Sequence, residues 1–149
     1  MDLVIRPATA ADFSEIHRIE MGSYSDPWPC SMFYLMRGRA PDLFLIAESG
    51  GSVVGYAIGE LERKEGVMVG HVMNVAVTEV FRRRGLAGRL MDELERRFKK
   101  RRAEASYLEV RASNIPAQSL YMKRGYVEAG VLPCYYYDED GLAMKKLLV

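Results

Sequence analysis

The chain has 149 residues, of which 49% are hydrophobic and 28% are charged. This length and composition exclude a disordered chain and fit one globular domain over residues 1–149. A formal net charge of +1 gives no reason to expect direct binding to nucleic acid.

The first half of the chain is predicted to contain a strand, two helices and three further strands. Thr9, with Asp12 three residues later, is typical of a helix N-terminus. Residues 23–30 contain two prolines and are expected to form a loop, and residues 49–51 a tight hairpin turn. The predicted strands and helices lie at residues 3–6, 9–20, 31–37, 43–48, 53–62 and 67–77.

The second half is predicted to contain helix, strand, helix and two strands. Residues 85–100 form an amphipathic helix, because apolar residues recur there every four positions, at Leu86, Leu90, Leu94 and Phe98. Gly125 is expected to end the next helix. The remaining predicted elements lie at residues 107–111, 114–124, 126–131 and 142–148, with 133–141 joining the last two.

This order of elements predicts an α/β fold, with a mixed seven-stranded sheet and about four helices on both faces. The strand–helix–strand unit between residues 72 and 111 should be a right-handed parallel crossover.

Cysteine usage and the N-terminus indicate a cytoplasmic protein. Cys30 and Cys134 are too few for a disulfide framework and show no metal-ligand spacing, so we expect free thiols and no metal. Residues 1–7 lack an export signal, and no apolar run approaches the roughly 20 residues that cross a bilayer. We therefore expect no membrane association.

The most informative segment is residues 72–90, where an apolar strand leads through a basic turn into a helix. The first amides of a helix have no partner within it and, with the helix dipole, favour an anion. Arg82–Arg84 add positive charge, and Gly85 and Gly88 would let the backbone approach a phosphate. The segment predicts a pyrophosphate site, although a solvated basic turn is the commoner explanation of the local pattern alone.

Several segments resemble one family. Arg82–Ala87 resembles the acyl-CoA motif Gln/Arg-x-x-Gly-x-Gly/Ala of the GNAT superfamily of N-acetyltransferases. The segment Leu108–Asn114 is similar to the protein N-terminal acetyltransferase branch, which includes ribosomal-protein alanine acetyltransferases and NatA-type catalytic subunits. Further residues of this chain also resemble that branch: Ala117, Leu120-Tyr121, Gly125-Tyr126, Tyr135–Asp140 and Ala143-Met144.

The chain departs from this family at two places. Ala87 stands where the bacterial ribosomal enzymes usually have glycine, and the motif tolerates alanine. Eukaryotic co-translational subunits place a functional glutamate in the first loop, where this chain has Pro27-Trp28. A catalytic base from that loop is therefore not expected here.

The resemblance implies a fold that holds acetyl-CoA. Backbone amides would hold its pyrophosphate at Arg83, Arg84, Gly85, Leu86, Ala87 and Gly88. The edge of Val75, Ala76 and Val77 would pair with the pantetheine arm, a bulge near this strand would open the sheet, and an N–H near Val75 would polarise the thioester carbonyl. Asn114 would bind the cofactor from the start of the following helix. From the residues alone, Val75–Val77 also fit a plain core strand.

Two residues are candidates for catalysis. Glu109 lies between Leu108 and Val110, where a carboxylate is unusual. It is either an ion-pair partner of Arg111 or a general base acting through water, the role that the resemblance implies. Tyr121 is either a core aromatic with a wet hydroxyl or the acid that protonates the departing thiolate and contacts the cofactor.

Substrate contacts are expected at four positions. His71 is either a second base acting through water or, as histidines more often are, a hydrogen-bonded structural residue. Tyr24, Tyr136 and Tyr137 would line a groove for a peptide backbone, although packing explains the tyrosines of the C-terminal segment equally well.

The leading hypothesis is an enzyme that transfers acetyl from acetyl-CoA to a protein N-terminus by direct attack in a ternary complex. An α-amine has a pKa near 8, so about one-tenth of it is neutral at pH 7, whereas a lysine amine is neutral in only about one molecule in 2,500. A modest base therefore suffices for an α-amine. The alternatives are acetylation of a small amine or lysine, or a non-catalytic acyl-CoA-binding module. The ribosome or an auxiliary subunit would be a further partner.

Overall fold

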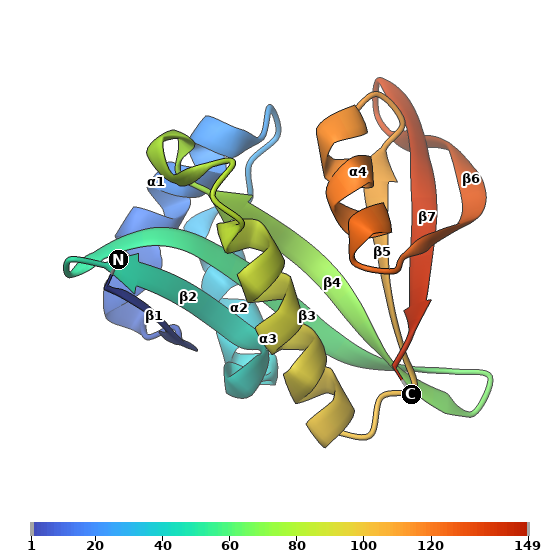
Figure 1. Ribbon diagram of the computed structural model, residues 1–149, viewed down its shortest axis with the longest axis horizontal. Helices are drawn as coiled ribbons and strands as arrows, with labels where there is room; N and C mark the ends of the chain where they lie inside the picture. Colours follow the sequence, from blue (N-terminus) through green and yellow to red (C-terminus); the bar gives the residue numbers. More distant parts are fainter. Residues whose placement is uncertain (1, 149) are drawn as a thin grey trace.

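The computed structural model describes residues 2–148, in which seven strands form one mixed sheet in the order β1-β2-β3-β4-β5-β7-β6 (Figure 1). Every neighbouring pair is antiparallel except β4 and β5, which are parallel and joined through α3. The strands are β1 (Leu3–Pro7), β2 (Phe44–Ser49), β3 (Ser52–Lys64), β4 (Val67–Val77), β5 (Ala105–Arg111), β6 (Val127–Tyr136) and β7 (Glu139–Leu147). The predicted α/β fold, mixed sheet and parallel crossover are confirmed.

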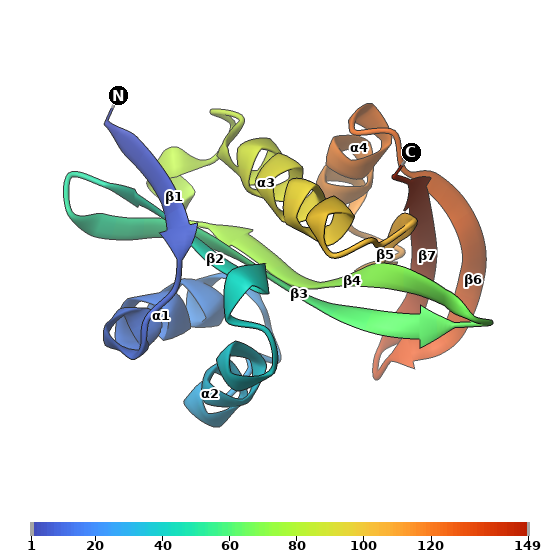
Figure 2. The same ribbon diagram turned by 90° about the horizontal axis from the view of Figure 1, so that it is seen from below.

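Four α-helices cover the two faces of this sheet, with α1 and α2 on one face and α3 and α4 on the other (Figure 2). Their bounds are α1 (Phe13–Ser23), α2 (Cys30–Arg39), α3 (Leu86–Lys100) and α4 (Ile115–Lys123). Short 3-10 helices precede α1, β2 and α3, at Ala10–Asp12, Pro41–Leu43 and Glu79–Phe81. Among residues 2–148, no helix has both the length and the apolarity needed to cross a bilayer.

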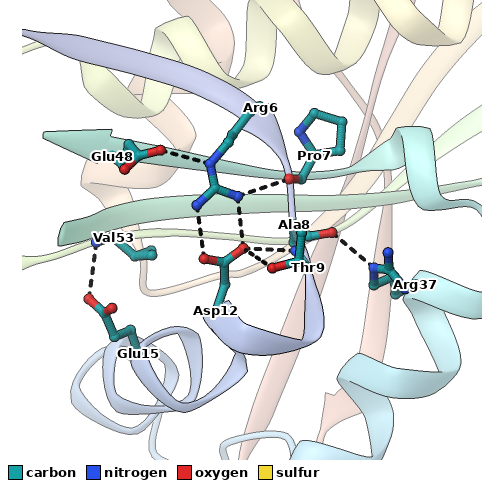
Figure 3. A network of polar contacts seen from close by, with 9 residues as sticks. All are labelled: Arg6, Pro7, Ala8, Thr9, Asp12, Glu15, Arg37, Glu48 and Val53. Carbon is teal, nitrogen blue, oxygen red and sulfur yellow. Dashed lines mark hydrogen bonds and ion pairs between the residues drawn. The ribbon is translucent and has the colours of Figure 1, made fainter. Parts of the chain in front are cut away.

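A 3-10 turn precedes α1, and the carboxylate of Asp12 at the end of that turn fixes where the α-helix starts. Asp12 accepts the backbone N–H of Thr9 at 2.7 Å and two guanidinium N–H groups of Arg6 at 2.9 Å (Figure 3). Arg6 also donates to Glu48 at 2.7 Å. The predicted Thr9–Asp12 pairing therefore exists and also ties β1 and β2 to the helix that follows.

The stripe of apolar residues on α3 packs on the sheet. Leu86, Leu90, Leu94 and Phe98 are all buried, as the four-residue repeat predicts. Gly59 and Gly70 on β3 and β4 lie directly beneath the Phe98 ring, which leaves no space for a methyl group on either. The ring therefore fits closely on two adjacent strands that lack side chains there.

The C-terminal hairpin is longer than predicted. Residues 133–141 were expected to be a connection, but β6 continues to Tyr136 and β7 begins at Glu139. Pro133 is compatible with this because β6 is an edge strand, where a missing N–H costs no sheet bond. The register shifts between Leu132 and Tyr136, and Asp140 accepts the N–H of Cys134 at 2.9 Å across the irregularity.

The pairing of β4 and β5 is short. It covers only Val69–His71 against Ala105–Tyr107, whereas β4 pairs with β3 along its whole length. Just beyond this junction β4 bulges, because Ile58 and Gly59 pair with Asn74 and Val72 and leave Met73 without a partner. Both strands then continue apart, which opens the sheet at their carboxyl ends (Figure 1).

Candidate active site

A cavity of about 600 Å³ lies where β4 and β5 diverge. Its walls come from β4, β5, the start of α4, the end of β6 and the segment after α1. Of the predicted site residues, it brings together Tyr24, His71, Val75, Glu109, Asn114, Tyr121 and Tyr136. Segments distant in the sequence thus form one site.

Glu109 is bonded to a histidine rather than to the arginine on its own strand. Its Oε1 lies 2.7 Å from Nε2 of His71. Arg111 instead donates to Asp138 at 2.6 Å and Glu139 at 3.2 Å on the β6–β7 hairpin. The ion pair between Glu109 and Arg111, one of the two explanations from the sequence, is wrong because the hairpin supplies Arg111 with closer carboxylates.

His71 bridges two carboxylates. Its Nδ1 lies 2.7 Å from Oε2 of Glu62, and its ring stacks on Tyr107 with centroids 4.1 Å apart. Burial alone would lower the pKa of the imidazole, but hydrogen bonds and charge from Glu109 and Glu62 outweigh burial and raise the pKa. The histidine is hydrogen-bonded, as the structural explanation predicts, and it also touches the proposed base.

Tyr121 and Asn114 approach the cavity from α4. Burial raises the pKa of the Tyr121 hydroxyl to about 12, so the hydroxyl keeps its proton at neutral pH. Asn114 is the N-cap of α4 and accepts the N–H of Ala117 at 3.2 Å. Its Oδ1 therefore positions the helix that carries Tyr121.

The N-terminus of α3 is open to an anion. Gly85 precedes the helix with a φ of 76°, a left-handed conformation that glycine adopts readily, and it offers no side chain to cap the first amides. Arg83 and Arg84 are exposed and form no ion pair among residues 2–148. Arg82 is anchored, since its Nε donates to Val77 O at 3.0 Å. The turn thus leaves backbone amides and two arginine side chains available to an anion.

Gly88 also has a packing role that was not predicted from the sequence. A Cβ at this position would overlap the guanidinium of Arg124, which reaches across from the end of α4. The glycine therefore leaves room for Arg124, which links α4 to α3 because its guanidinium lies 3.4 Å from the carboxylate of Asp92 on α3. The sequence could not indicate this, because nothing local brings Arg124 to Gly88.

The last residues of β4 combine core side chains with an exposed backbone edge. Ala76 and Val77 are buried, and Val75 packs against the same core. The Tyr24 hydroxyl donates to Val75 O at 2.7 Å, which ties the segment after α1 to this strand. The bulge lies at Met73 in β4, the strand near which the resemblance implies one.

The aromatic residues of the hairpin divide between the cavity and solvent. Tyr136 lines the cavity, and so does Tyr135, which the sequence did not single out. Tyr137 is fully exposed and is not brought to the cavity. Tyr137 follows the last residue of β6 and lies in the turn to β7, outside the strand that carries the other two.

One polar cluster was missed. Glu20 is 1% exposed at the cavity wall, and its carboxylate accepts Asn74 Nδ2 at 2.9 Å and Trp28 N–H at 2.8 Å. The Tyr56 hydroxyl donates to it as well. Glu20 lies on the buried face of α1 with Ile16 and Ile19, and a carboxylate on an apolar stripe was the available signal.

A mixed sheet that opens between two parallel strands, with an uncapped helix after the first, can hold an extended ligand that carries an anionic group. The chain matches the acetyltransferase (GNAT) family over residues 13–126 and belongs to it. Among its relatives is the N-alpha-acetyltransferase of Sulfurisphaera tokodaii, 35% identical over 150 residues, which cover 94% of this chain and 90% of that protein.

Two solved structures share the fold. Ard1 from Thermoplasma volcanium has a TM-score of 0.93 and 27% identity, with 100% of this chain and 99% of that chain covered. The NatB acetyltransferase complex bound to CoA and MES has a chain with a TM-score of 0.88 and 25% identity, covering 98% and 99% respectively.

Proposed function

We propose that this protein transfers acetyl from acetyl-CoA to the free N-terminal α-amine of proteins. The observation that carries the proposal is the cavity between β4 and β5, which brings Glu109 and Tyr121 together beside the unpaired edge of β4. A relative named N-alpha-acetyltransferase and a similar structure bound to CoA support the same reaction.

The chain offers acetyl-CoA three kinds of contact. The uncapped amides at the start of α3, with Arg83 and Arg84, would hold the diphosphate. The edge of β4 beyond His71 faces no strand among the described residues and would pair with the pantetheine arm. Asn114 lines the same cavity.

Glu109 and Tyr121 would then handle the two protons of the reaction. Glu109 takes a proton from the substrate ammonium through water, and the freed nitrogen attacks the thioester carbonyl carbon. A C–N bond forms, the nitrogen gives up its second proton through water, and the C–S bond breaks as the thiolate takes the proton of the Tyr121 hydroxyl. The second proton from nitrogen restores the Tyr121 hydroxyl and Glu109 releases the first to solvent, so each turnover yields acetylated amine, CoA and one released proton.

The cavity walls favour a polypeptide over a small amine. Tyr24, Trp28, Tyr135 and Tyr136 line it. Flat aromatic walls suit an extended backbone, and the proposed base is adequate for an α-amine but weak for lysine. We further propose that the enzyme works in the cytoplasm, with the ribosome or an auxiliary subunit as partner.

The test is a comparison of acceptors by mass spectrometry. A short peptide with a free N-terminus should gain one acetyl group, whereas the same peptide with a blocked N-terminus and one lysine should gain little, as should metabolite amines. Faster acetylation of the lysine peptide or of a small amine would contradict the proposal that the substrate is a protein N-terminus. Tight CoA binding without any product would indicate a binding module instead.

A further inference from the structure

A line of polar side chains extends from Glu109 away from the acetyl-transfer cavity. His71 on β4 lies 2.7 Å from Glu109 on β5 and 2.7 Å from Glu62 on β3. The Tyr107 hydroxyl donates to the other oxygen of Glu62, and the Tyr107 ring stacks on the imidazole at an interplanar angle of 11°. The imidazole is therefore fixed at both nitrogens and on one ring face.

The two hydrogen bonds of His71 require two protons. An ionised carboxylate can only accept, so each ring nitrogen that faces one must carry a hydrogen. A neutral imidazole would leave one bare nitrogen 2.7 Å from a carboxylate oxygen, where two acceptors repel. The protonation of His71 is consequently coupled to the negative charge of the two carboxylates that its ring nitrogens face.

Other titratable groups surround the imidazole, and the carboxylates outnumber the cations among them. Glu60 on β3 pairs with His71 in the sheet register, and its carboxylate lies within 4.8 Å of the Glu62 carboxylate and a ring nitrogen of His71. The Lys64 ammonium lies 3.8 Å from the centroid of the Tyr107 ring. From β6, Tyr135 faces Glu109, whose charge adds to burial in raising the pKa of Tyr135. The net negative surroundings favour the imidazolium.

We propose that Glu62 is a positioning residue for acetyl transfer. It holds the Nδ1 proton of His71, so that Nε2–H stays on Oε1 of Glu109 and leaves Oε2 for the water that meets the amine. Glu62 itself touches neither substrate. The inference rests on the proposed function, in which Glu109 is the base.

The direct test is an NMR titration of the two histidines in Glu62→Gln. Glutamine keeps the size of the side chain but removes the charge that stabilises the imidazolium, so the His71 midpoint should fall by about one pH unit or more. His17 should not move and is an internal reference. In Glu60→Gln, which removes a nearby charge but no bond to His71, the fall should be less than half as large. This readout needs no substrate, so it stands even if acetyl transfer fails.

Kinetics completes the test. Glu62→Gln should lower kcat about tenfold at pH 7, leave the KM for acetyl-CoA unchanged, and shift the pH–rate profile in step with the His71 midpoint. If Glu62→Gln does not fold, Glu62→Asp keeps the charge but shortens the side chain and so weakens its hydrogen bond to His71, and it should move both readouts the same way by a smaller amount. An unmoved His71 midpoint, or an unmoved pH–rate profile, would overturn the proposal.

Discussion

Glu109 and Tyr121 come from different walls of one cavity and differ in how they hold a proton. The half-buried Tyr121 makes no side-chain hydrogen bond among residues 2–148, and burial raises the pKa of its hydroxyl to about 12. One carboxylate oxygen of Glu109 lies against the His71 imidazole, and Glu109 stands between the buried Leu108 and Val110 on β5. The first is suited to donate a proton at neutral pH, and the second to accept one.

Replacement of Glu109 by glutamine should remove the base. We expect kcat/KM for a peptide to fall about a hundredfold at pH 7, because general-base catalysis contributes roughly 10²–10⁴, while the KM for acetyl-CoA stays near its value. The rate of the variant should rise more steeply with pH, since only amine that is already neutral reacts. Glu104→Gln, an exposed carboxylate just before β5, is the control. A rate within twofold of the parent would remove Glu109 from the mechanism.

Replacement of Tyr121 by phenylalanine should remove the hydroxyl that acts as the general acid but keep the ring that fills the cavity wall. The expected result is a fall in kcat of at least about tenfold with little change in the peptide KM. Tyr34→Phe alters an exposed hydroxyl on α2 and should behave as the parent. Steady-state kinetics at saturating acetyl-CoA measures both, and equal rates for the two variants would show that the Tyr121 hydroxyl is not used.

The candidate site could be predicted from the sequence only where its signals are local. An acidic residue in an apolar strand, a tyrosine on a helix and a basic glycine turn are each visible in a short window. The bond from Glu109 to His71 is not, because it joins residues 38 positions apart and depends on the register of β4 with β5. The same applies to Arg124 above Gly88.

At the scale of elements, local periodicity located every helix and strand, and contacts across the sheet account for the differences. The repeat on α3 predicts which face is buried, and the structure confirms it. Nothing in that repeat indicates that Phe98 requires glycines beneath it. Nor does the sequence of β6 indicate that pairing with β7 continues beyond Pro133, since pairing depends on the partner strand.

Substitution of Gly70 by alanine should therefore destabilise the fold. The added methyl would overlap the Phe98 ring, which is buried and held by α3, and overpacking of this kind costs about 1–3 kcal/mol. Gly130→Ala makes the same change on β6, where nothing lies within 4 Å. Urea unfolding should show a lower midpoint for Gly70→Ala only. Equal midpoints would mean that the ring moves aside freely.

On the scale of the whole molecule, the polar network around Arg6 connects the N-terminal strand to the rest of the sheet (Figure 3). Its hydrogen bonds hold the pKa of the Asp12 carboxyl below the usual value. A carboxylate of this kind contributes stability above its unfolded pKa of about 3.9, and that contribution is lost as the pH falls through the folded pKa.

Asp12→Asn should accordingly lower the free energy of unfolding at pH 7 by about 1–3 kcal/mol, since a charged acceptor for Arg6 and Thr9 is lost. The difference from the parent should shrink as the pH is lowered below about 4. Asp2→Asn, an exposed residue with no ion pair in the described part of the chain, should show no difference at either pH. Urea titrations at pH 7 and pH 3 measure the free energy of unfolding of each protein. A difference between Asp12→Asn and the parent that does not change with pH would show that the Asp12 charge is not its cause.

Because β4 and β5 pair only briefly, the end of β4 is left open, and the length of this open segment limits which acyl donor fits along it. The strand advances about 3.3 Å per residue, so the four steps from the bulge at Met73 to the strand end at Val77 span about 13 Å. An acyl donor must cover that length between its reactive carbon and its phosphates. An acyl phosphate, whose two groups share one oxygen, is too short to occupy both ends, and a thioester on a long extended arm has the required reach.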